Sequence, residues 1–204
     1  MPELLLFNKP YGVICQFSAH PTHQSLADYI DAPGFYAAGR LDTDSEGLLL
    51  LTDHGGLQHR ITDPGHKLPK TYWVQVEGVP SSQQLAQLAA GVDLGDFISL
   101  PASVRQMAPP VLWPRNPPVR ERKTVPDSWL ELTIREGKNR QVRRMTAKVG
   151  LPTLRLVRVK IGDWQLESLQ PGEMRRIQVA APAAPQPSVR RNLPRKPLAR
   201  NGKR

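Results

Sequence analysis

The chain has 204 residues, 39% of them hydrophobic, which is enough apolar material for one core or for a core shared between two lobes. Its 28 lysines and arginines exceed its 18 aspartates and glutamates, and the net charge of +10 favours a polyanionic partner such as a nucleic acid. The single cysteine, Cys15, excludes an intrachain disulfide and a cysteine-based zinc site, and no apolar run reaches the ~20 residues that cross a bilayer. We therefore expect a cytoplasmic protein that contacts no membrane.

The first part of the chain predicts three strands. The apolar run 4–7 forms a short strand that ends at the turn-forming residues 8–12. A polar loop with glycine at each end, residues 39–47, leads into the apolar run 48–51, which is too short for a helix and predicts a buried strand. Residues 70–78 alternate between two sets of side chains, and this period of two indicates a third strand.

The middle of the chain predicts a helix and two further strands. Serines at 81 and 82 offer an N-cap for a helix that continues to about residue 90. Residues 97–107 and 129–135 have the composition of strands. Residues 108–128, which separate these two strands, contain six prolines, so we predict a surface loop there.

The last part predicts one helix, two strands and a tail. Asn139 is expected to cap a helix over residues 140–149, which Gly150 terminates. Strands are predicted at 154–161 and 175–179. Many strands with few helices between them indicate an α+β fold with a mostly antiparallel sheet.

The polar loop 39–47 carries three carboxylates within five residues beside Arg40: Asp42, Asp44 and Glu46. A solvated acidic turn is one interpretation, because the flanking glycines supply backbone freedom. A calcium loop is a second, because the three carboxylates and Gly47 stand at positions 1, 3, 5 and 6 of such a loop, with Asp53 at position 12. An aspartate at position 12 and the strand-like run that follows the loop count against calcium.

Four motifs, in this order, resemble those of the small-subunit-type bacterial pseudouridine synthases. They are NKPYG at 8–12, GRLD with SEGLLLLT within 39–52, KTY at 70–72 and EGKNRQVRRM at 136–145. Each motif is weak alone, but the ordered set is specific and the resemblance spans about residues 3–179. It implies a pseudouridine synthase catalytic domain over 1–180, with a mixed sheet in two lobes, a few flanking helices and a central RNA-binding cleft.

The resemblance also implies the reaction and its residues. Uridine would be isomerised to pseudouridine without redox change or net hydrolysis, so no cofactor and no metal is expected. Asp42 aligns with the catalytic carboxylate, Arg143 with the arginine that pairs with it, and Tyr72 with the aromatic ring that stacks on the flipped base. Arg40 resembles the arginine that fills the place vacated by the extruded nucleotide. From the pattern alone, Arg143 is an ordinary surface arginine and Tyr72 an inward strand residue.

Basic residues near the predicted last helix suggest a phosphate-contacting surface. Residues 137–162 contain eight lysines and arginines and no acid. The RNA-binding candidates are Lys138, Arg140, Arg144 and Lys148, together with Arg40. The five histidines form no convincing metal-ligand set: His20, His23, His54, His59 and His66.

The expected partner is ribosomal RNA. Most relatives carry an S4-like RNA-binding domain ahead of the catalytic domain, whereas this chain begins at LLLFNKP, as in a branch that modifies large-subunit RNA. We therefore expect 23S rRNA, free or in an assembly intermediate, as the substrate of a monomer. Residues 181–204, with seven basic residues and no acid, are predicted to form a disordered Pro/Arg-rich tail that aids binding. A metal-dependent RNA nuclease and a non-catalytic ribosome-assembly factor remain as alternatives.

Overall fold

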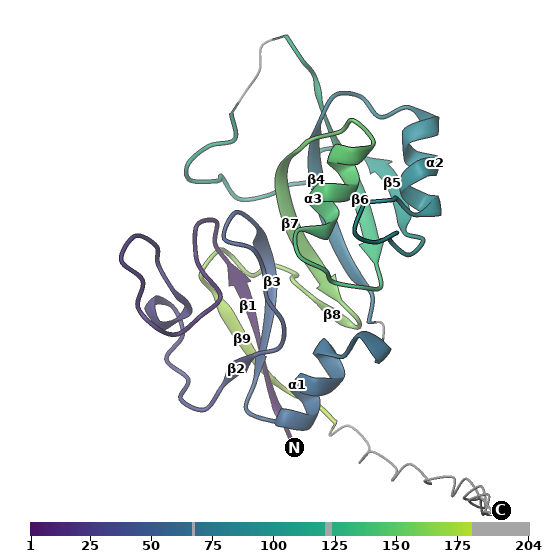
Figure 1. Cartoon of the computed structure of the whole chain (residues 1–204). Helices are drawn as coiled ribbons and strands as arrows, with labels where there is room; N and C mark the ends of the chain where they lie inside the picture. The colour runs from purple at the N-terminus through teal and green to yellow at the C-terminus, as the bar shows by residue number, and fades with distance from the viewer. Residues whose placement is uncertain (67, 121–123, 181–204) are drawn as a thin grey trace, which may run out of the picture.

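The computed structural model describes residues 1–66, 68–120 and 124–180, so the predicted tail 181–204 lies outside the described residues. Within these ranges the chain forms three α-helices, two short 3-10 helices and nine strands (Figure 1). The elements are β1 (Glu3–Lys9), η1 (Leu26–Asp28), β2 (Tyr36–Ala37), β3 (Glu46–Thr52), α1 (Gly55–Thr62), η2 (Pro64–His66), β4 (Lys70–Glu77), α2 (Ser82–Ala90), β5 (Ser103–Met107), β6 (Asp127–Ile134), α3 (Gln141–Lys148), β7 (Thr153–Ile161), β8 (Trp164–Gln165) and β9 (Met174–Gln178). In the described part of the chain, no helix has the length and apolar composition needed to cross a membrane.

The strands form one sheet in the order β5-β6-β4-β7-β3-β1-β9, with β2 added to β3 and β8 added to β7. Neighbouring strands run antiparallel, apart from the parallel pair of β3 and β7. The predicted α+β fold with a mostly antiparallel sheet is therefore confirmed.

The sheet has a narrow joint between β3 and β7. The two strands pair at Glu46↔Val157 and at Gly47↔Arg158. A Cβ atom on Gly47 would lie 2.3 Å from the carbonyl oxygen of Arg158, and the φ of Gly47 is +101°, so this approach requires glycine. The joint divides the sheet into one half with α2 and α3 and another half with α1, which are the two expected lobes (Figure 1).

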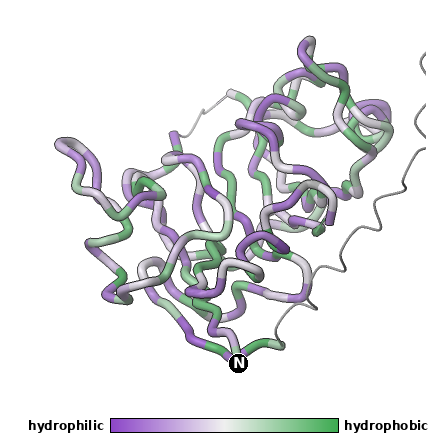
Figure 2. Tube along the Cα trace, turned by 60° about the horizontal axis from the view of Figure 1, so that its bottom comes forward, coloured by the Kyte–Doolittle hydropathy of each residue, from purple (hydrophilic) through white to green (hydrophobic). Residues whose placement is uncertain are grey.

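β3 forms the centre of the lobe that holds α1. All seven of its residues are buried. Leu48 and Leu50 pack in one hydrophobic cluster, whereas Leu49 and Leu51 pack in another. A strand buried on both faces is apolar throughout rather than alternating, which explains the run of leucines. Figure 2 shows hydrophobic stretches along the central strands and mostly hydrophilic outer loops.

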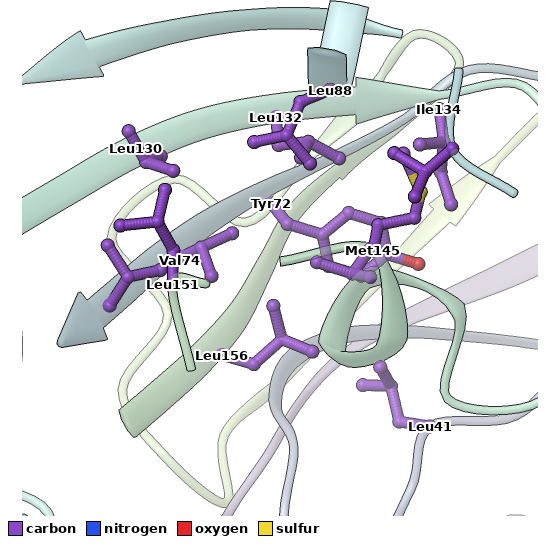
Figure 3. Close-up of a cluster of buried hydrophobic side chains, with 13 residues drawn as sticks. Leu41, Tyr72, Val74, Leu88, Leu130, Leu132, Ile134, Met145, Leu151 and Leu156 are labelled. Carbon is purple, nitrogen blue, oxygen red and sulfur yellow. The ribbon is translucent and has the colours of Figure 1, made fainter. Parts of the chain in front are cut away.

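The other lobe packs α2 and α3 against β4 and β6. Tyr72, Val74 and Val76 alternate into a cluster with side chains from β6. Val142 and Met145 of α3 enter the same cluster. Figure 3 shows Met145 beside the ring of Tyr72. This packing holds α3 against the part of β4 that contains Tyr72.

Three local predictions were wrong or incomplete. Helix α1 was not predicted, because it is short and begins with two glycines, which are poor helix formers. Helix α3 takes Arg140, in a left-handed conformation with φ of 48°, as its N-cap instead of Asn139. The expected surface loop 108–128 is partly anchored, because Trp113 packs against the hydrophobic cluster around β3.

Candidate active site

A cleft of about 490 Å³ opens where the polar loop after β2, the start of β4 and the segment before α3 meet. Asp42 lines this cleft together with Tyr72 and Arg40. Further lining residues come from the segment before α3 and from β7: Glu136, Lys138, Asn139, Arg140, Gln141 and Arg158. The cleft therefore brings the predicted catalytic carboxylate and the predicted stacking aromatic into one site, from different strands and loops.

Two hydrogen bonds with residues 12 and 15, which follow β1, hold the backbone of the loop that carries Asp42. Gly12 donates its N–H to the carbonyl oxygen of Thr43 at 2.8 Å. Leu41 donates its N–H to the sulfur of Cys15 at 3.3 Å. The backbones of both neighbours of Asp42 are therefore fixed, and among the described residues no hydrogen bond holds the Asp42 carboxylate itself.

Two arginines from the other lobe complete this support. Arg143 donates from Nη2 to the backbone oxygen of Asp44 at 2.7 Å. Arg158, which is buried, donates from Nη1 to the oxygen of Arg40 at 3.3 Å and from Nε to that of Leu48 at 2.8 Å. The loop with Asp42 is therefore attached to both lobes across the joint of the sheet.

Lys9 is a fully buried cation beneath this loop. Its ammonium group donates to the backbone oxygens of Pro10 and Val13 at 2.9 and 2.7 Å, and lies 3.5 Å from that of Thr43. Burial away from water disfavours the charged form, and the pKa of Lys9 is lowered to about 8. The charges of Cys15, Glu46 and Asp44 act in the opposite direction.

Asp44 forms ionic contacts with two arginines. Arg140 binds both of its carboxylate oxygens, at 2.9 and 2.8 Å, and the Nε of Arg143 lies 3.4 Å from Oδ2. Partial burial opposes ionisation of Asp44, but the hydrogen bonds from Arg140 and the charge of Arg143 outweigh it and lower the pKa of Asp44. Asp42 lies 3.8 Å from Nη1 of Arg140.

The pairing of Arg143 differs from the prediction. Its ion-pair partner in the described chain is Asp44, whereas Arg140 is the arginine that reaches Asp42. Arg140 precedes the first turn of α3 in a left-handed backbone conformation, and its guanidinium lies between the helix and the two aspartates of the loop. Arg143 is largely buried, and burial lowers its pKa while the charge of Asp44 raises it.

Glu46 is engaged in the interior and does not face the cleft. Arg155 donates to both of its carboxylate oxygens at 2.9 and 2.8 Å, and Trp113 donates its indole N–H at 2.8 Å. Asp53 follows the far end of β3, about 23 Å along the strand at the usual rise per residue. The calcium loop is therefore contradicted. A metal-dependent nuclease that used the three carboxylates Asp42, Asp44 and Glu46 would also lack Glu46, which Arg155 binds in the interior.

Tyr72 is both a core residue and a cleft residue. It is 7% exposed and its ring packs near Met145 and Leu132 (Figure 3). It also lines the cleft beside Asp42. The two interpretations of Tyr72, as an inward strand residue and as a wall for a base, are therefore compatible.

The predicted RNA-binding residues divide into two groups. Arg40, Lys138 and Arg140 line the cleft. Arg144 forms an ion pair with Asp96 and Lys148 lies exposed at the end of α3, and neither is among the cleft residues. Two members of the basic run 137–162 are buried, so the expectation that the whole run forms a phosphate-contacting surface was wrong: Arg155 and Arg158.

Two supporting residues were missed from the sequence. Lys9 lies within the NKPYG motif, but nothing in the motif indicates that its ammonium group is buried. Arg158 interrupts a mostly apolar strand at a buried position next to the joint. A charged residue in an apolar strand was the feature of the sequence that could have indicated a buried, paired arginine. Both bind backbone oxygens, which a sequence does not locate.

The histidines differ from the prediction in one place. His59 and His66 lie on either side of Asp63, and one ligand atom from each of the three residues lies within 4.8 Å of the others. The three come from the end of α1 and from η2, which follow each other closely once the unpredicted helix is formed.

Comparison with known proteins places this chain in a family. Residues 3–148 match the family model described as RNA pseudouridylate synthase. The chain is 65% identical over 175 residues to the ribosomal large subunit pseudouridine synthase E of Xanthomonas campestris, covering 84% of this chain and 94% of that relative. It is 54% identical over 177 residues to the protein of the same name from Vibrio parahaemolyticus, covering 87% and 74%. The ribosomal small subunit pseudouridine synthase A of Escherichia coli is 36% identical over 178 residues, with 85% and 70% covered.

Solved structures agree with this assignment. The crystal structure of a pseudouridylate synthase superposes with a TM-score of 0.72 at 34% sequence identity, covering 87% of this chain and 71% of that chain. The human RNA pseudouridylate synthase domain containing 1 superposes with a TM-score of 0.51 at 14% identity, covering 90% and 82%. The second likeness supports the fold alone.

Proposed function

The chain belongs to the RNA pseudouridylate synthase family, and we propose that it isomerises a uridine of 23S ribosomal RNA with Asp42 as the catalytic carboxylate. The observation that carries the proposal is the cleft in which Asp42 faces the same space as Tyr72 and Arg40. The catalytic domain is proposed to occupy residues 1–180, with 181–204 as a basic tail.

The chemistry needs one well-placed carboxylate. The N1–C1′ bond of uridine breaks, the detached base turns, a C5–C1′ bond forms, and the proton at C5 moves to N1 through solvent or a protein group. Asp42 supports this reaction either as a nucleophile at C1′ or as a base that removes the proton at C2′. In either route its negative charge stabilises the positive charge that develops on the ribose.

The cleft is suited to a nucleotide that has left its helix. Flipping a base costs a few kcal/mol, and contacts to the flipped base and to the vacated position offset that cost. Tyr72 supplies an aromatic wall for the uracil. Arg40, which is exposed at the edge of the cleft, is placed to enter the RNA where the nucleotide was.

Phosphate binding is assigned to the basic edge of the cleft. Lys138 and Arg140 lie two positions apart just before α3, and both line the cleft. Arg140 is bound to Asp44, so a phosphate would compete with this carboxylate for the same guanidinium. Arg143 is proposed to act through Asp44, by holding the loop, rather than by direct contact with Asp42.

The choice of 23S RNA rests on the names of two relatives. The proteins from Xanthomonas and Vibrio are named for the ribosomal large subunit, and they are more similar to this chain than the small-subunit enzyme of Escherichia coli is. A monomer in the cytoplasm is the proposed working form. Free RNA and an assembly intermediate are both candidate substrates.

The test is tritium release from ribosomal RNA that carries [5-³H]uridine. Wild-type protein should release tritium from 23S RNA and not from 16S RNA, and Asp42→Asn should release none while it still binds the RNA. Equal release by Asp42→Asn would remove Asp42 from its role. Absence of release from both RNAs, or RNA cleavage that EDTA abolishes, would overturn the proposed reaction.

A second measurement identifies the position. Pseudouridines in the ribosomal RNA of cells that lack the gene can be mapped chemically and compared with those of the parent. One missing site in 23S RNA, restored by wild-type protein and not by Asp42→Asn, is the expected result.

A further inference from the structure

The end of α1 holds two imidazoles and a carboxylate around one point in space. His59 and Asp63 are four residues apart, and His66 follows three residues later on η2. The Nε2 atom of His59 lies 3.7 Å from Oδ2 of Asp63, and the Nδ1 atom of His66 lies 3.6 Å from the same oxygen. Among the described residues, this is the group of three whose ligand atoms are close enough to share an ion.

These separations are typical of ligands around a metal rather than of direct hydrogen bonds. A hydrogen bond between an imidazole and a carboxylate brings the two atoms to about 2.7–3.2 Å. Ligands at ~2.0–2.2 Å from a tetrahedral zinc ion are separated from one another by about 3.4 Å. Both contacts to Asp63 are closer to the second value, so the spacing of these three groups is compatible with a shared ion.

The carboxylate of Asp63 is oriented by its own backbone. The N–H of Gly65 donates to Oδ1 at 2.7 Å, which leaves Oδ2 directed to the two imidazoles. A ligand carboxylate whose second oxygen accepts a hydrogen bond is the usual arrangement around protein metal ions. The turn after α1 therefore holds the Asp63 carboxylate in a fixed orientation without a bound ion.

We propose that His59, Asp63 and His66 bind a divalent transition-metal ion such as Zn²⁺. Two imidazoles and one carboxylate suit Zn²⁺, Co²⁺ or Ni²⁺ better than Mg²⁺ or Ca²⁺, which prefer oxygen ligands. Three protein ligands leave one position for water. The side chain of His59 is 72% exposed, so the ion exchanges with solvent and is not sealed in the fold.

The site has a structural consequence because of where it lies. Residues 63–69 connect α1 in one lobe to β4 in the other, and β4 carries Lys70 and Tyr72 of the cleft. An ion bound by all three side chains would join the end of α1 to η2 within this connection. The ion would constrain the connection that leads to β4 and its cleft residues. It would contribute no group to the proposed reaction.

The probe is Zn²⁺ added to metal-free, full-length protein, followed by calorimetry, with Co²⁺ as a spectroscopic substitute. One equivalent should bind and raise the melting temperature, and Co²⁺ should give the visible absorption of a four- or five-coordinate ion. His59→Ala and His66→Ala should each weaken binding by more than the ~10–100-fold that removal of an outer-shell partner costs.

The matched control is the double variant His20→Ala/His23→Ala. These two imidazoles also lie close together, with ring centroids 5.1 Å apart, but belong to a different loop and have Thr22 between them. Binding that survives in this control and fails in His59→Ala and His66→Ala supports the site. Absence of saturable Zn²⁺ binding to the wild type would overturn the site, whatever the outcome of the tritium assay. So would Zn²⁺ binding by His59→Ala and His66→Ala as tight as that of the wild type.

Discussion

Arg140 binds both carboxylate oxygens of Asp44, at 2.9 and 2.8 Å, from a backbone conformation that few residues other than glycine adopt. A left-handed conformation costs roughly 1–2 kcal/mol for a residue with a side chain. At this position the guanidinium of Arg140 lies between the two aspartates. Its Nη1 atom is 3.8 Å from Oδ2 of Asp42. The start of α3 is thereby coupled to the loop that carries the proposed catalytic carboxylate.

The first prediction concerns this contact. Asp44→Asn should lower the rate of tritium release by about 10- to 100-fold, because the loop shifts when its charged anchor is lost, and small displacements of a catalytic group have effects of this size. The effect should appear in kcat more than in KM. The control is Glu167→Gln, which removes a surface ion pair with Arg175. Neither residue of that pair lines the cleft. An Asp44→Asn protein as active as wild type would show that the loop does not depend on this pair.

The second prediction concerns the joint between the lobes. Gly47→Ala should destabilise the protein by about 3 kcal/mol, because the added Cβ would lie 2.3 Å from the backbone oxygen of Arg158 in the paired strand β7. Gly78→Ala is the matched control. Its φ of +94° is as unfavourable for alanine, but the nearest atom, Cδ2 of Leu151, is 3.8 Å away, so we expect only about 1–2 kcal/mol.

Chemical unfolding in urea measures both glycine variants. The difference between them isolates the clash from the conformational strain, since both alanines share the latter. Equal losses of stability would mean that β3 and β7 separate easily, contrary to the close approach of their backbones.

The third prediction concerns the buried pair of Glu46 and Arg155. Glu46→Gln should cost about 3–5 kcal/mol, because it leaves a buried guanidinium without its counter-charge. The segment that contains Trp113 should also become more sensitive to proteases, since the indole N–H donates to the same carboxylate. Glu3→Gln removes an exposed pair with Arg176 and should cost no more than about 1 kcal/mol. Urea unfolding and limited proteolysis check the two parts, and similar losses in both variants would contradict the buried pairing.

The fourth prediction is a pH dependence that arises from Lys9. Its pKa in the folded protein is about 8, below the 10.5 of a free lysine, so the unfolded chain binds more protons between these two values. The penalty of the buried charge is complete below pH 8 and is relieved as the pH rises toward 10.5. Relative to Lys9→Met, wild-type stability should therefore increase over this range, by on the order of 3 kcal/mol at most.

Unfolding free energies at several pH values from 7.5 to 10.5 provide the measurement for Lys9. The exposed Lys148→Met variant controls for the general effect of removing one positive charge. A constant difference between wild type and Lys9→Met across the range would show that Lys9 titrates alike in the folded and unfolded chains.

The sequence alone predicted seven of the nine strands of the described chain and two residues that line the cleft. It missed the two-residue strands β2 and β8, and β5 begins at Ser103 rather than at the predicted residue 97. The leucine run of β3 and the alternation of β4 depend on burial of neighbouring positions, and such local periodicity can be read without a structure. The order of the motifs likewise pointed to Asp42 and Tyr72, which the fold places in one cleft.

The contacts among charged groups were decided only by the tertiary structure. Arg143 was expected to pair with Asp42 and instead contacts Asp44, whereas Arg155 and Arg158, which appeared to belong to a basic surface, are buried at the joint. The direction of a long charged side chain depends on partners that are distant in sequence, here residues about a hundred positions apart. Composition determined that this chain is basic, and its motifs determined which residues are proposed to react. Folding determined which of its cations remain accessible, because Arg155 and Arg158 are buried where they bind a carboxylate and backbone oxygens.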